Sequence, residues 1–265
     1  MLPSKLYVFS LLLTVSICKF SYAASCEQRS GLARAALIEL YTSEGCSSCP
    51  PADRWMRQLI PKVFSASEVV PLAFHVDYWD RLGWRDRFAS PVFTARQYAS
   101  AKASGSGFVF TPQVILGGRN YSGWSNISSL QQDVRLAHSL APEADIVLHQ
   151  QSVASGKVEF EVKSQLRGDV KLSDVRIYAA LFQNGLESEV LHGENEGSRL
   201  QHDFVVRELY TSKRIDSSGR ISIHEHFGLP ADAKAGEMGV AVFAQDAKTG
   251  TVLQAMSAPL CLTRK

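Results

Sequence analysis

The sequence predicts an α/β domain in its N-terminal half and an all-β, sandwich-like domain in its C-terminal half. Up to about residue 142, continuous apolar runs alternate with helical patterns, which is typical of parallel strands and their crossover helices. Beyond that point apolar and polar residues alternate with a period of two, as in half-buried strands. A third observation concerns Cys46 and Cys49, which stand three residues apart where a helical pattern begins.

The first strand and helix are defined by the residues around these cysteines. Residues 35–41 form an apolar run that predicts a buried strand. Pro50 and Pro51 fit the first helical turn, where backbone N–H groups have no partner within the helix. We therefore expect Ser48 to cap a helix that ends at Pro61.

The later elements follow the order of a thioredoxin fold. The predicted elements are a strand at 69–76, a helix at 90–104, a strand at 110–116, a short strand at 121–124 and a helix at 127–140. The order of strands and helices predicts a thioredoxin-like domain over residues 26–142. Short alternating segments then predict a β-sandwich over residues 143–265, with strands at 144–149, 157–163, 170–182, 204–209, 220–225, 239–244 and 252–255.

Residues 1–23 have the three regions of a secretory signal peptide. Lys5 supplies the positive charge, residues 6–18 the apolar region and residues 21–23 a small-residue cleavage site. An uncleaved anchor is the alternative, but we expect a periplasmic or secreted protein. The chain has 28 Lys and Arg and 26 Asp and Glu, so removing Lys5 and Lys19 leaves no net charge. A neutral chain gives no reason to expect nucleic acid or an anionic membrane as a partner.

The cysteines that remain after cleavage are even in number, as expected in an oxidising compartment. If Cys46 pairs with Cys49, then Cys26 and Cys261 are left at opposite ends of the chain. Chain termini often lie close together, so one hypothesis is a Cys26–Cys261 disulfide. Two free or lipid-modified thiols are the alternative.

The pattern around Cys46 and Cys49 is typical of thiol–disulfide exchange. The N-terminus of a helix lowers the pKa of a nearby thiol, so Cys46 is the expected nucleophile and Cys49 the resolving thiol. Pro112 resembles the proline that thioredoxin-like folds hold in the cis form beside the cysteine pair, and this resemblance implies a cis bond that leaves the backbone of Thr111 free to pair with an extended substrate. An ordinary trans proline at a strand edge is the alternative. We expect a protein thiol or disulfide as the partner and no cofactor or metal.

Acidic and histidine side chains near the cysteines are the next candidates for a role at the site. Glu39 is the nearest candidate for a buried proton carrier, but strand alternation aims it at the opposite face of the sheet. Glu44 is expected to be solvated. His75 and Asp77 share a strand face, either beside Cys46 or as a core histidine followed by a loop-capping aspartate.

Two other function classes stay open. Cys46, Cys49 and His75 would form a soft copper or zinc site, although a single Cys-x-x-Cys lacks the second pair of a typical zinc site. Alternatively, the disulfide is purely structural and the protein is a non-catalytic binding module.

Several motifs resemble the bacterial secreted family called domain of unknown function 1223. They span residues 39–53, 73–80, 83–84, 88–91 and 110–113, with further similarity at 193–197 and 205–209. This family is thioredoxin-like, so the resemblance implies that fold and a redox pair at Cys46 and Cys49. It implies no particular substrate.

Overall fold

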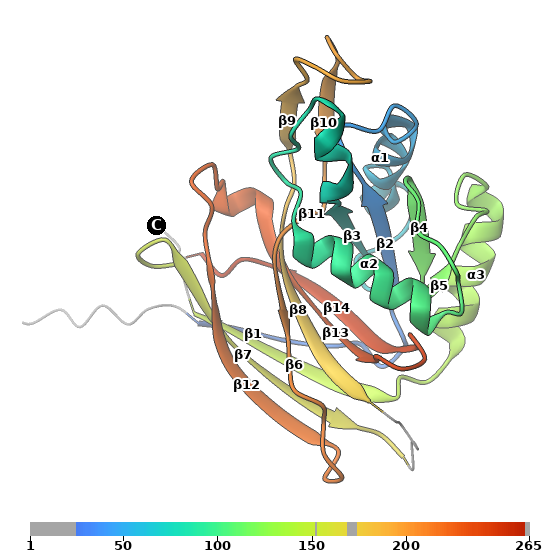
Figure 1. Ribbon diagram of the computed structural model, residues 1–265. Coiled ribbons are helices and arrows are strands. Elements are labelled where there is room, and N and C mark those ends of the chain that lie inside the picture. The colour runs from blue at the N-terminus through green and yellow to red at the C-terminus, as the bar shows by residue number, and fades with distance from the viewer. Residues whose placement is uncertain (1–24, 152, 169–173, 263–265) are drawn as a thin grey trace, which may run out of the picture.

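The computed structural model describes residues 25–151, 153–168 and 174–262 (Figure 1). The structure is mostly β, with 40% of residues in strands and 20% in helices. The described strands form an eight-stranded sheet in the order β14-β13-β8-β11-β3-β2-β4-β5, a four-stranded sheet in the order β1-β6-β7-β12, and the β9–β10 hairpin.

The elements follow one another along the chain in a mixed order. They are β1 (Ser25–Arg29), β2 (Ala36–Thr42), α1 (Pro50–Met56), a π-helical turn (Leu59–Val63), β3 (Val69–His75), a 3-10 helix (Asp77–Leu82), α2 (Pro91–Ala103), β4 (Gln113–Leu116), β5 (Arg119–Asn120), α3 (Ile127–Ser139), β6 (Ala144–Gln151), β7 (Lys157–Leu166), β8 (Val175–Gln183), β9 (Leu186–Glu189), β10 (Arg199–His202), β11 (Val205–Thr211), β12 (Arg220–Gly228), a 3-10 turn (Ala235–Glu237), β13 (Met238–Asp246) and β14 (Val252–Pro259).

Strand β2 is buried on both faces. Its even-numbered residues, such as Ile38 and Leu40, pack against α1 and α3, while Leu37 and Tyr41 pack with residues of α2 and the C-terminal strands. β2 pairs in parallel with β3 and antiparallel with β4. Helices on both faces explain why this strand is an unbroken apolar run rather than an alternating one.

The two halves of the chain share one sheet. Strand β11 pairs in parallel with β3 at Val205 and Ala73 and antiparallel with β8. The N–H of Ala73 also donates to the carbonyl of Phe204 at 2.8 Å. β13 and β14 continue the sheet beyond β8.

The predicted fold class, an α/β thioredoxin-like N-terminal domain followed by an all-β sandwich-like C-terminal domain, is therefore wrong. The chain is mostly β, and strands from both predicted domains form a large mixed sheet. The edge of β3 is paired by a strand more than a hundred residues away, and pairing through backbone groups leaves no mark on the side-chain pattern. The division at Pro142 itself stays a prediction.

A second core lies between the four-stranded sheet and strands β8, β13 and β14. Phe160, Ile177, Val240 and Leu253 are among its buried residues. At the edge of this layer, β1 pairs with β6. β1 also carries the Cys26–Cys261 disulfide, with a Cα–Cα distance of 5.7 Å, which confirms that hypothesis.

Most individual elements are confirmed, but the short strand predicted at 121–124 is wrong, because residues 122–125 form a turn and the strand β5 lies before them at Arg119–Asn120. A second difference concerns α1. The helix is capped by Cys49 rather than Ser48 and ends at Met56 rather than at Pro61. Ile60 is extended, with φ −123° and ψ 132°, because a residue that precedes proline is pushed out of the helical region. The strands β1, β9 and β10 were not predicted, and the predicted strand start at 170–173 lies outside the described residues.

The predicted signal peptide also lies outside the described residues. Across the part of the chain that is described, no helix has both the length and the apolar character needed to cross a membrane.

Arg96 of α2 joins both halves of the large sheet. Its Nε lies 2.7 Å from the Glu39 carboxylate of β2, and both side chains are buried. The guanidinium also lies over the rings of Tyr178 of β8 and Phe243 of β13, at 4.7 and 4.9 Å from their centroids. A buried carboxylate of this kind is stable only while its cation is present.

We predict that Arg96→Met destabilises the protein by about 3–5 kcal/mol, because Glu39 would stay buried without its cation and would keep the hydrogen bond from the Tyr41 hydroxyl, at 3.2 Å, in its place. Urea unfolding measures the change. Arg29→Met is the matched control, since Arg29 and Glu27 form an exposed pair that should contribute less than about 1 kcal/mol. Equal unfolding midpoints for the two variants would contradict the role of Arg96.

Candidate functional site

The candidate site lies where the parallel strands β2 and β3 end. Thr42 and His75, the last residues of these strands, are register partners, so the segments that follow both strands emerge at the same sheet edge. The chain turns after Thr42 and reaches Cys46, which forms a disulfide with Cys49 at a Cα–Cα distance of 5.4 Å. Both cysteines are fully buried, at 0% exposure.

Helix α1 begins directly at this disulfide. Cys49 is the N-cap, and its carbonyl accepts from the N–H groups of Ala52 and Asp53 at 2.9 and 3.1 Å. Pro50 and Pro51 take the first two helical positions, where their missing N–H groups leave no helical hydrogen bond unmade. The sequence pattern therefore fixes the helix start at the second cysteine.

Trp79 connects the cysteine turn to the predicted proline loop. Its indole Nε1 donates to Thr111 Oγ1 at 2.8 Å. On the other side, a Cβ placed on Gly45 would lie 3.3 Å from the Cβ of Trp79, so the turn before Cys46 rests against this residue. The Thr111–Pro112 peptide bond is cis, as expected.

A buried carboxylate, Asp86, is hydrogen-bonded to the turn that precedes Cys46. Asp86 Oδ2 lies 2.6 Å from His75 Nδ1 and accepts from the N–H of Glu44 at 2.9 Å. Its Oδ1 accepts from the N–H of Phe88 at 2.9 Å. One side chain thus connects the end of β3, the turn before Cys46 and the segment that precedes α2.

Glu44 is buried rather than solvated, so that expectation is wrong. Its carboxylate accepts from Trp84 Nε1 at 2.8 Å and lies 3.4 Å from His202 Nε2. His202 belongs to β10, and its other ring nitrogen lies 3.9 Å from Asp53. The β9–β10 hairpin, which the sequence did not predict, is what removes Glu44 from solvent.

The two histidines and Phe88 form one buried ring cluster. The rings of His75 and His202 meet edge to face at 4.9 Å, and Phe88 lies 5.3 and 5.8 Å from them. Asp53 completes the cluster and accepts from Thr42 Oγ1 at 3.3 Å. Five ionisable side chains therefore share this buried region, namely Glu44, Asp53, His75, Asp86 and His202.

These groups shift one another's pKa values in opposite directions. Burial lowers the pKa of His75, but the charge of Asp86 and their hydrogen bond outweigh it, so the pKa of His75 is raised. Burial likewise opposes ionisation of Asp86 and Glu44. The charge of His75 nevertheless lowers the pKa of Asp86, and hydrogen bonds, first that of His202, lower the pKa of Glu44. Asp53 differs, because burial dominates and raises its pKa.

A loop of the β9–β10 hairpin is hydrogen-bonded to the cysteine turn. Asn195 Nδ2 donates to the carbonyls of Glu44 and Cys46 at 2.8 and 3.0 Å. The exposed carboxylate of Glu194 accepts from the N–H and hydroxyl of Ser47 at 3.0 and 2.7 Å. We call residues 193–197 the cap loop.

The structure also decides between the interpretations of the other candidate residues. His75 is a hydrogen-bonded core histidine, but its partner is Asp86 and not Asp77, which accepts instead from Thr94 Oγ1 at 2.6 Å. Glu39 faces away from α1 and pairs with Arg96, as strand alternation predicted.

The metal-site interpretation finds no support in the donor set. The sulfurs of Cys46 and Cys49 are bonded to each other, and His75 Nδ1 is held by Asp86. Among the residues that the structure describes, no three His, Cys, Asp or Glu side chains stand close enough to hold a metal ion.

Asp53, Asp86, Asn195 and His202 are the site residues that sequence reasoning missed. Asn195 had a signal, because it lies in the 193–197 motif of the family resemblance. His202 lies in an alternating segment with no chemical pattern of its own, and only the hairpin brings it to the cysteines.

A comparison with protein families matches a segment that contains both the cysteine turn and the β9–β10 hairpin. A family model described as "Protein of unknown function (DUF1223)" matches residues 37–245. The chain belongs to the DUF1223 family. No curated protein matches it at a significant level.

Two solved structures are similar to this DUF1223 chain. A crystal structure of a protein from Agrobacterium tumefaciens has 27% identity and a TM-score of 0.62, covering 88% of this chain and 97% of that one. HBP35 of Porphyromonas gingivalis has 12% identity and a TM-score of 0.65, covering 87% and 76%. At that identity the second similarity shows the fold alone.

We predict that Asp86→Asn destabilises the protein most at weakly acidic pH. A raised pKa means that His75 stabilises the fold fully below its unfolded pKa, about 6.5, and that this stabilisation is lost as the pH rises through the folded value. Asp86, with its lowered pKa, contributes above about pH 3.9 and loses that contribution as the pH falls through its folded value. The loss in Asp86→Asn should therefore be largest, at about 3–5 kcal/mol, between about pH 4 and 6.5.

Urea unfolding between about pH 4 and 9 measures this difference. Asp216→Asn, at an exposed turn residue, is the control and should change stability by less than about 1 kcal/mol. A deficit in Asp86→Asn that stays constant across this range would show that His75 and Asp86 do not form a charged pair.

Proposed function

We propose that this protein is an exported thiol–disulfide oxidoreductase that exchanges the Cys46–Cys49 disulfide with cysteines of a protein partner. The observation that carries the proposal is the cluster of five buried ionisable side chains next to the disulfide turn, which it joins at Glu44 through the N–H bond to Asp86 and the contact with His202. A purely structural disulfide needs no such cluster, whereas shifted pKa values of buried groups gather at sites of proton transfer.

The exchange is balanced in two steps. A thiolate of the partner attacks Cys46 Sγ, the Cys46–Cys49 bond breaks, and its electron pair leaves on Cys49 Sγ, which takes a proton. A second partner thiolate then attacks the partner's sulfur in the mixed disulfide and releases Cys46, which is protonated in turn. The partner loses two electrons and two protons, and the cysteine pair gains them. The reverse direction starts from the Cys46 thiolate.

Asp53 is placed to supply the proton to Cys49. It lies one helical turn beyond Cys49, so both side chains share a face of α1. Its raised pKa favours the protonated acid, which can donate when the Cys49 thiolate leaves. His202 lies between this carboxyl and Glu44, with its ring nitrogens 3.9 Å from Asp53 and 3.4 Å from Glu44.

The cap loop controls access to the disulfide. Because both cysteines are fully buried, a partner thiolate reaches Cys46 only when the cap loop opens. The polar contacts that join the cap loop to the cysteine turn come from two side chains, Asn195 and Glu194. Local opening of such a loop costs far less than global unfolding.

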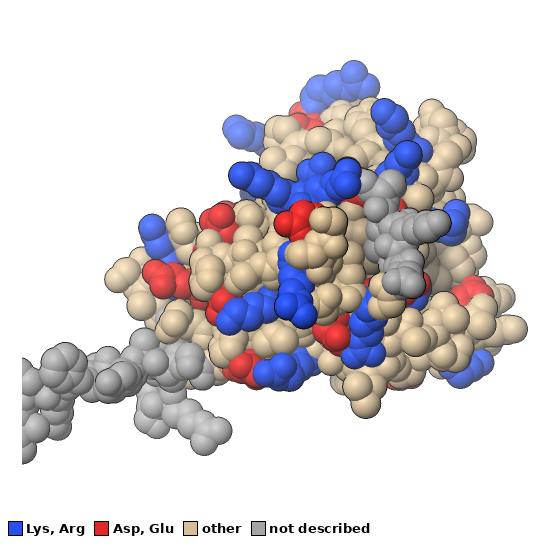
Figure 2. Space-filling view, turned by 90° about the horizontal axis from the view of Figure 1, so that it is seen from below, with Lys and Arg blue, Asp and Glu red and all other residues tan. Residues whose placement is uncertain are grey.

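Partner and location are part of the proposal. Two disulfides favour an oxidising compartment, which agrees with the predicted signal peptide. On the face seen in Figure 2, acidic and basic side chains are interspersed. Elsewhere in the chain, a basic residue such as Arg176 has an acidic partner, Asp174. This supports a protein partner rather than nucleic acid or a membrane surface.

A binding module with a structural disulfide is the second candidate. The specific observation in its favour is the complete burial of Cys46 and Cys49, since structural disulfides are typically inaccessible.

Disulfide transfer to a fluorescent dithiol peptide tests the proposal. We expect the oxidised protein to convert the peptide to its disulfide, Cys46→Ser to abolish transfer, and a Cys26→Ser/Cys261→Ser variant to retain it. Cys46→Ser as active as the native protein would contradict the assignment. An intact native disulfide that never transfers would favour the binding module.

Asn195→Ala should make the disulfide more reactive. Loss of two hydrogen bonds, each worth about 0.5–1.5 kcal/mol, favours the open cap loop and should speed reduction of Cys46–Cys49 by dithiothreitol by about 10-fold. Glu196→Ala, at an exposed position of the same loop, is the matched control. Equal rates for the two variants would show that the cap loop does not limit access.

Asp53→Asn should slow transfer by about 100-fold and remove the alkaline limb of its pH profile, because the amide cannot donate the proton. Thr42→Val is the companion variant. It removes a hydrogen bond that lowers the pKa of Asp53, so the alkaline limb should move to higher pH. An unchanged limb in both variants would exclude Asp53 as the proton donor.

A further inference from the structure

The outer face of the four-stranded sheet carries a row of alternating acidic and histidine side chains. Each strand supplies one of them: Glu27 of β1, His149 of β6, Glu161 of β7 and His224 of β12. The strand registers pair Glu27 with His149, His149 with Glu161, and Glu161 with His224. The row therefore runs straight across the four-stranded sheet, whereas the cysteine motif follows β2 of the eight-stranded sheet.

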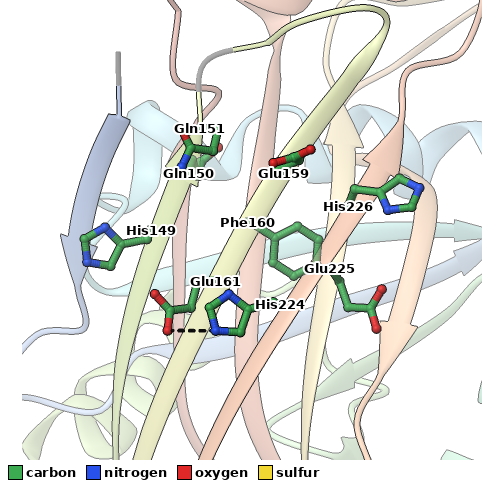
Figure 3. Close-up of a pocket in the computed structure, with 9 residues that line it drawn as sticks. All are labelled: His149, Gln150, Gln151, Glu159, Phe160, Glu161, His224, Glu225 and His226. Carbon is green, nitrogen blue, oxygen red and sulfur yellow. Dashed lines mark ion pairs between the residues drawn. The ribbon is translucent and has the colours of Figure 1, made fainter. Parts of the chain in front are cut away.

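The members of the row contact one another in pairs. His149 Nε2 lies 2.5 Å from Glu27 Oε2, and His224 Nε2 lies 3.2 Å from Glu161 Oε1. Figure 3 shows Glu161 turned toward His224, while His149 points away from both.

A hollow of about 450 Å³ lies over this part of the sheet. The row forms one side of it, and the register pair of Glu159 with His226 forms the next row (Figure 3). The hollow is thus lined by three histidines and by carboxylates, which are the side chains that bind transition metals.

We propose that His149, Glu161 and His224 bind a divalent transition-metal ion of the zinc class on this face. Two imidazoles and one carboxylate supply three ligands and leave a fourth position for water. Side chains directly opposite on neighbouring strands have Cβ atoms about 4.5–5.5 Å apart, so an ion above Glu161 is within reach of the histidines on both sides.

Binding requires His149 to turn from Glu27 toward Glu161, since the described side chains do not converge on one point as they stand. The side chains of His149 and His224 are 39% and 74% exposed, so neither ring is fixed in a packed core, and His149 has to leave its contact with Glu27. Glu161 is held in place, because its carboxylate accepts from Ser222 Oγ at 3.0 Å.

Lys163 is the group that competes with the metal. Its ammonium lies 2.9 Å from the same oxygen of Glu161, and its side chain is 57% exposed. An incoming ion displaces this ammonium. A variant that lacks the Lys163 charge should therefore bind the metal ion more tightly. A row of charged side chains that only contacts solvent would not show this effect.

Zinc titration of the oxidised full-length protein by calorimetry tests the site. The closed Cys26–Cys261 and Cys46–Cys49 disulfides leave no thiols at these positions to compete for zinc. We expect one zinc ion per chain. His149→Ala and His224→Ala should each weaken binding by at least about 10-fold, because even outer-shell partners of a metal cost about 10- to 100-fold when removed.

Two further variants separate this site from non-specific binding. Lys163→Met should tighten binding about 2- to 5-fold, as expected for removal of an exposed competing charge. His192→Ala, at an exposed histidine outside the row, should leave the affinity unchanged. A dissociation constant weaker than about 1 mM, or an affinity that His149→Ala and His224→Ala do not change, would overturn the proposal.

Discussion

The carboxylate of Asp86 is the constraint on which the candidate site depends. It accepts from His75 at the end of β3, from the N–H of Glu44 before the cysteines and from the N–H of Phe88 before α2. These three segments have no other common partner among the described contacts. A buried anion that receives several donors and raises the pKa of the histidine it faces is stable, and it fixes the position of every segment that it contacts. The cysteine turn is thus attached to the core of the sheet rather than displayed on a mobile loop.

The second half of the chain also contacts the cysteine turn. β11 extends the sheet at β3, and the β9–β10 hairpin that precedes it brings His202 beneath the turn and Asn195 above it. The disulfide is therefore enclosed between residues of both halves. In the proposed exchange, the C-terminal half takes part through His202, which lies 3.9 Å from Asp53, and through Asn195, which donates to the carbonyls of the cysteine turn.

Much of the local structure could be predicted from the sequence, but the assembly could not. Pro50 and Pro51 fixed the start of α1 within one residue, and alternation placed Glu39 on the face away from the cysteines. The pairing of β11 with β3 could not be predicted from the sequence, because the hydrogen bonds that join two strands are made by backbone groups and do not depend on the side chains. Burial of Glu44 was missed for the same reason: its partner His202 comes from a hairpin about 150 residues away, whose short strands carry a weak alternating pattern.

The central claim is that Cys46–Cys49 is a redox centre, whereas Cys26–Cys261 is a structural disulfide in the same chain. Equilibration of the native protein in a glutathione series, followed by alkylation and mass analysis, measures both potentials in one sample. The account predicts that Cys46–Cys49 titrates between about −120 and −270 mV and that Cys26–Cys261 stays oxidised below about −300 mV. A Cys46–Cys49 potential below about −300 mV, indistinguishable from that of Cys26–Cys261, would contradict it.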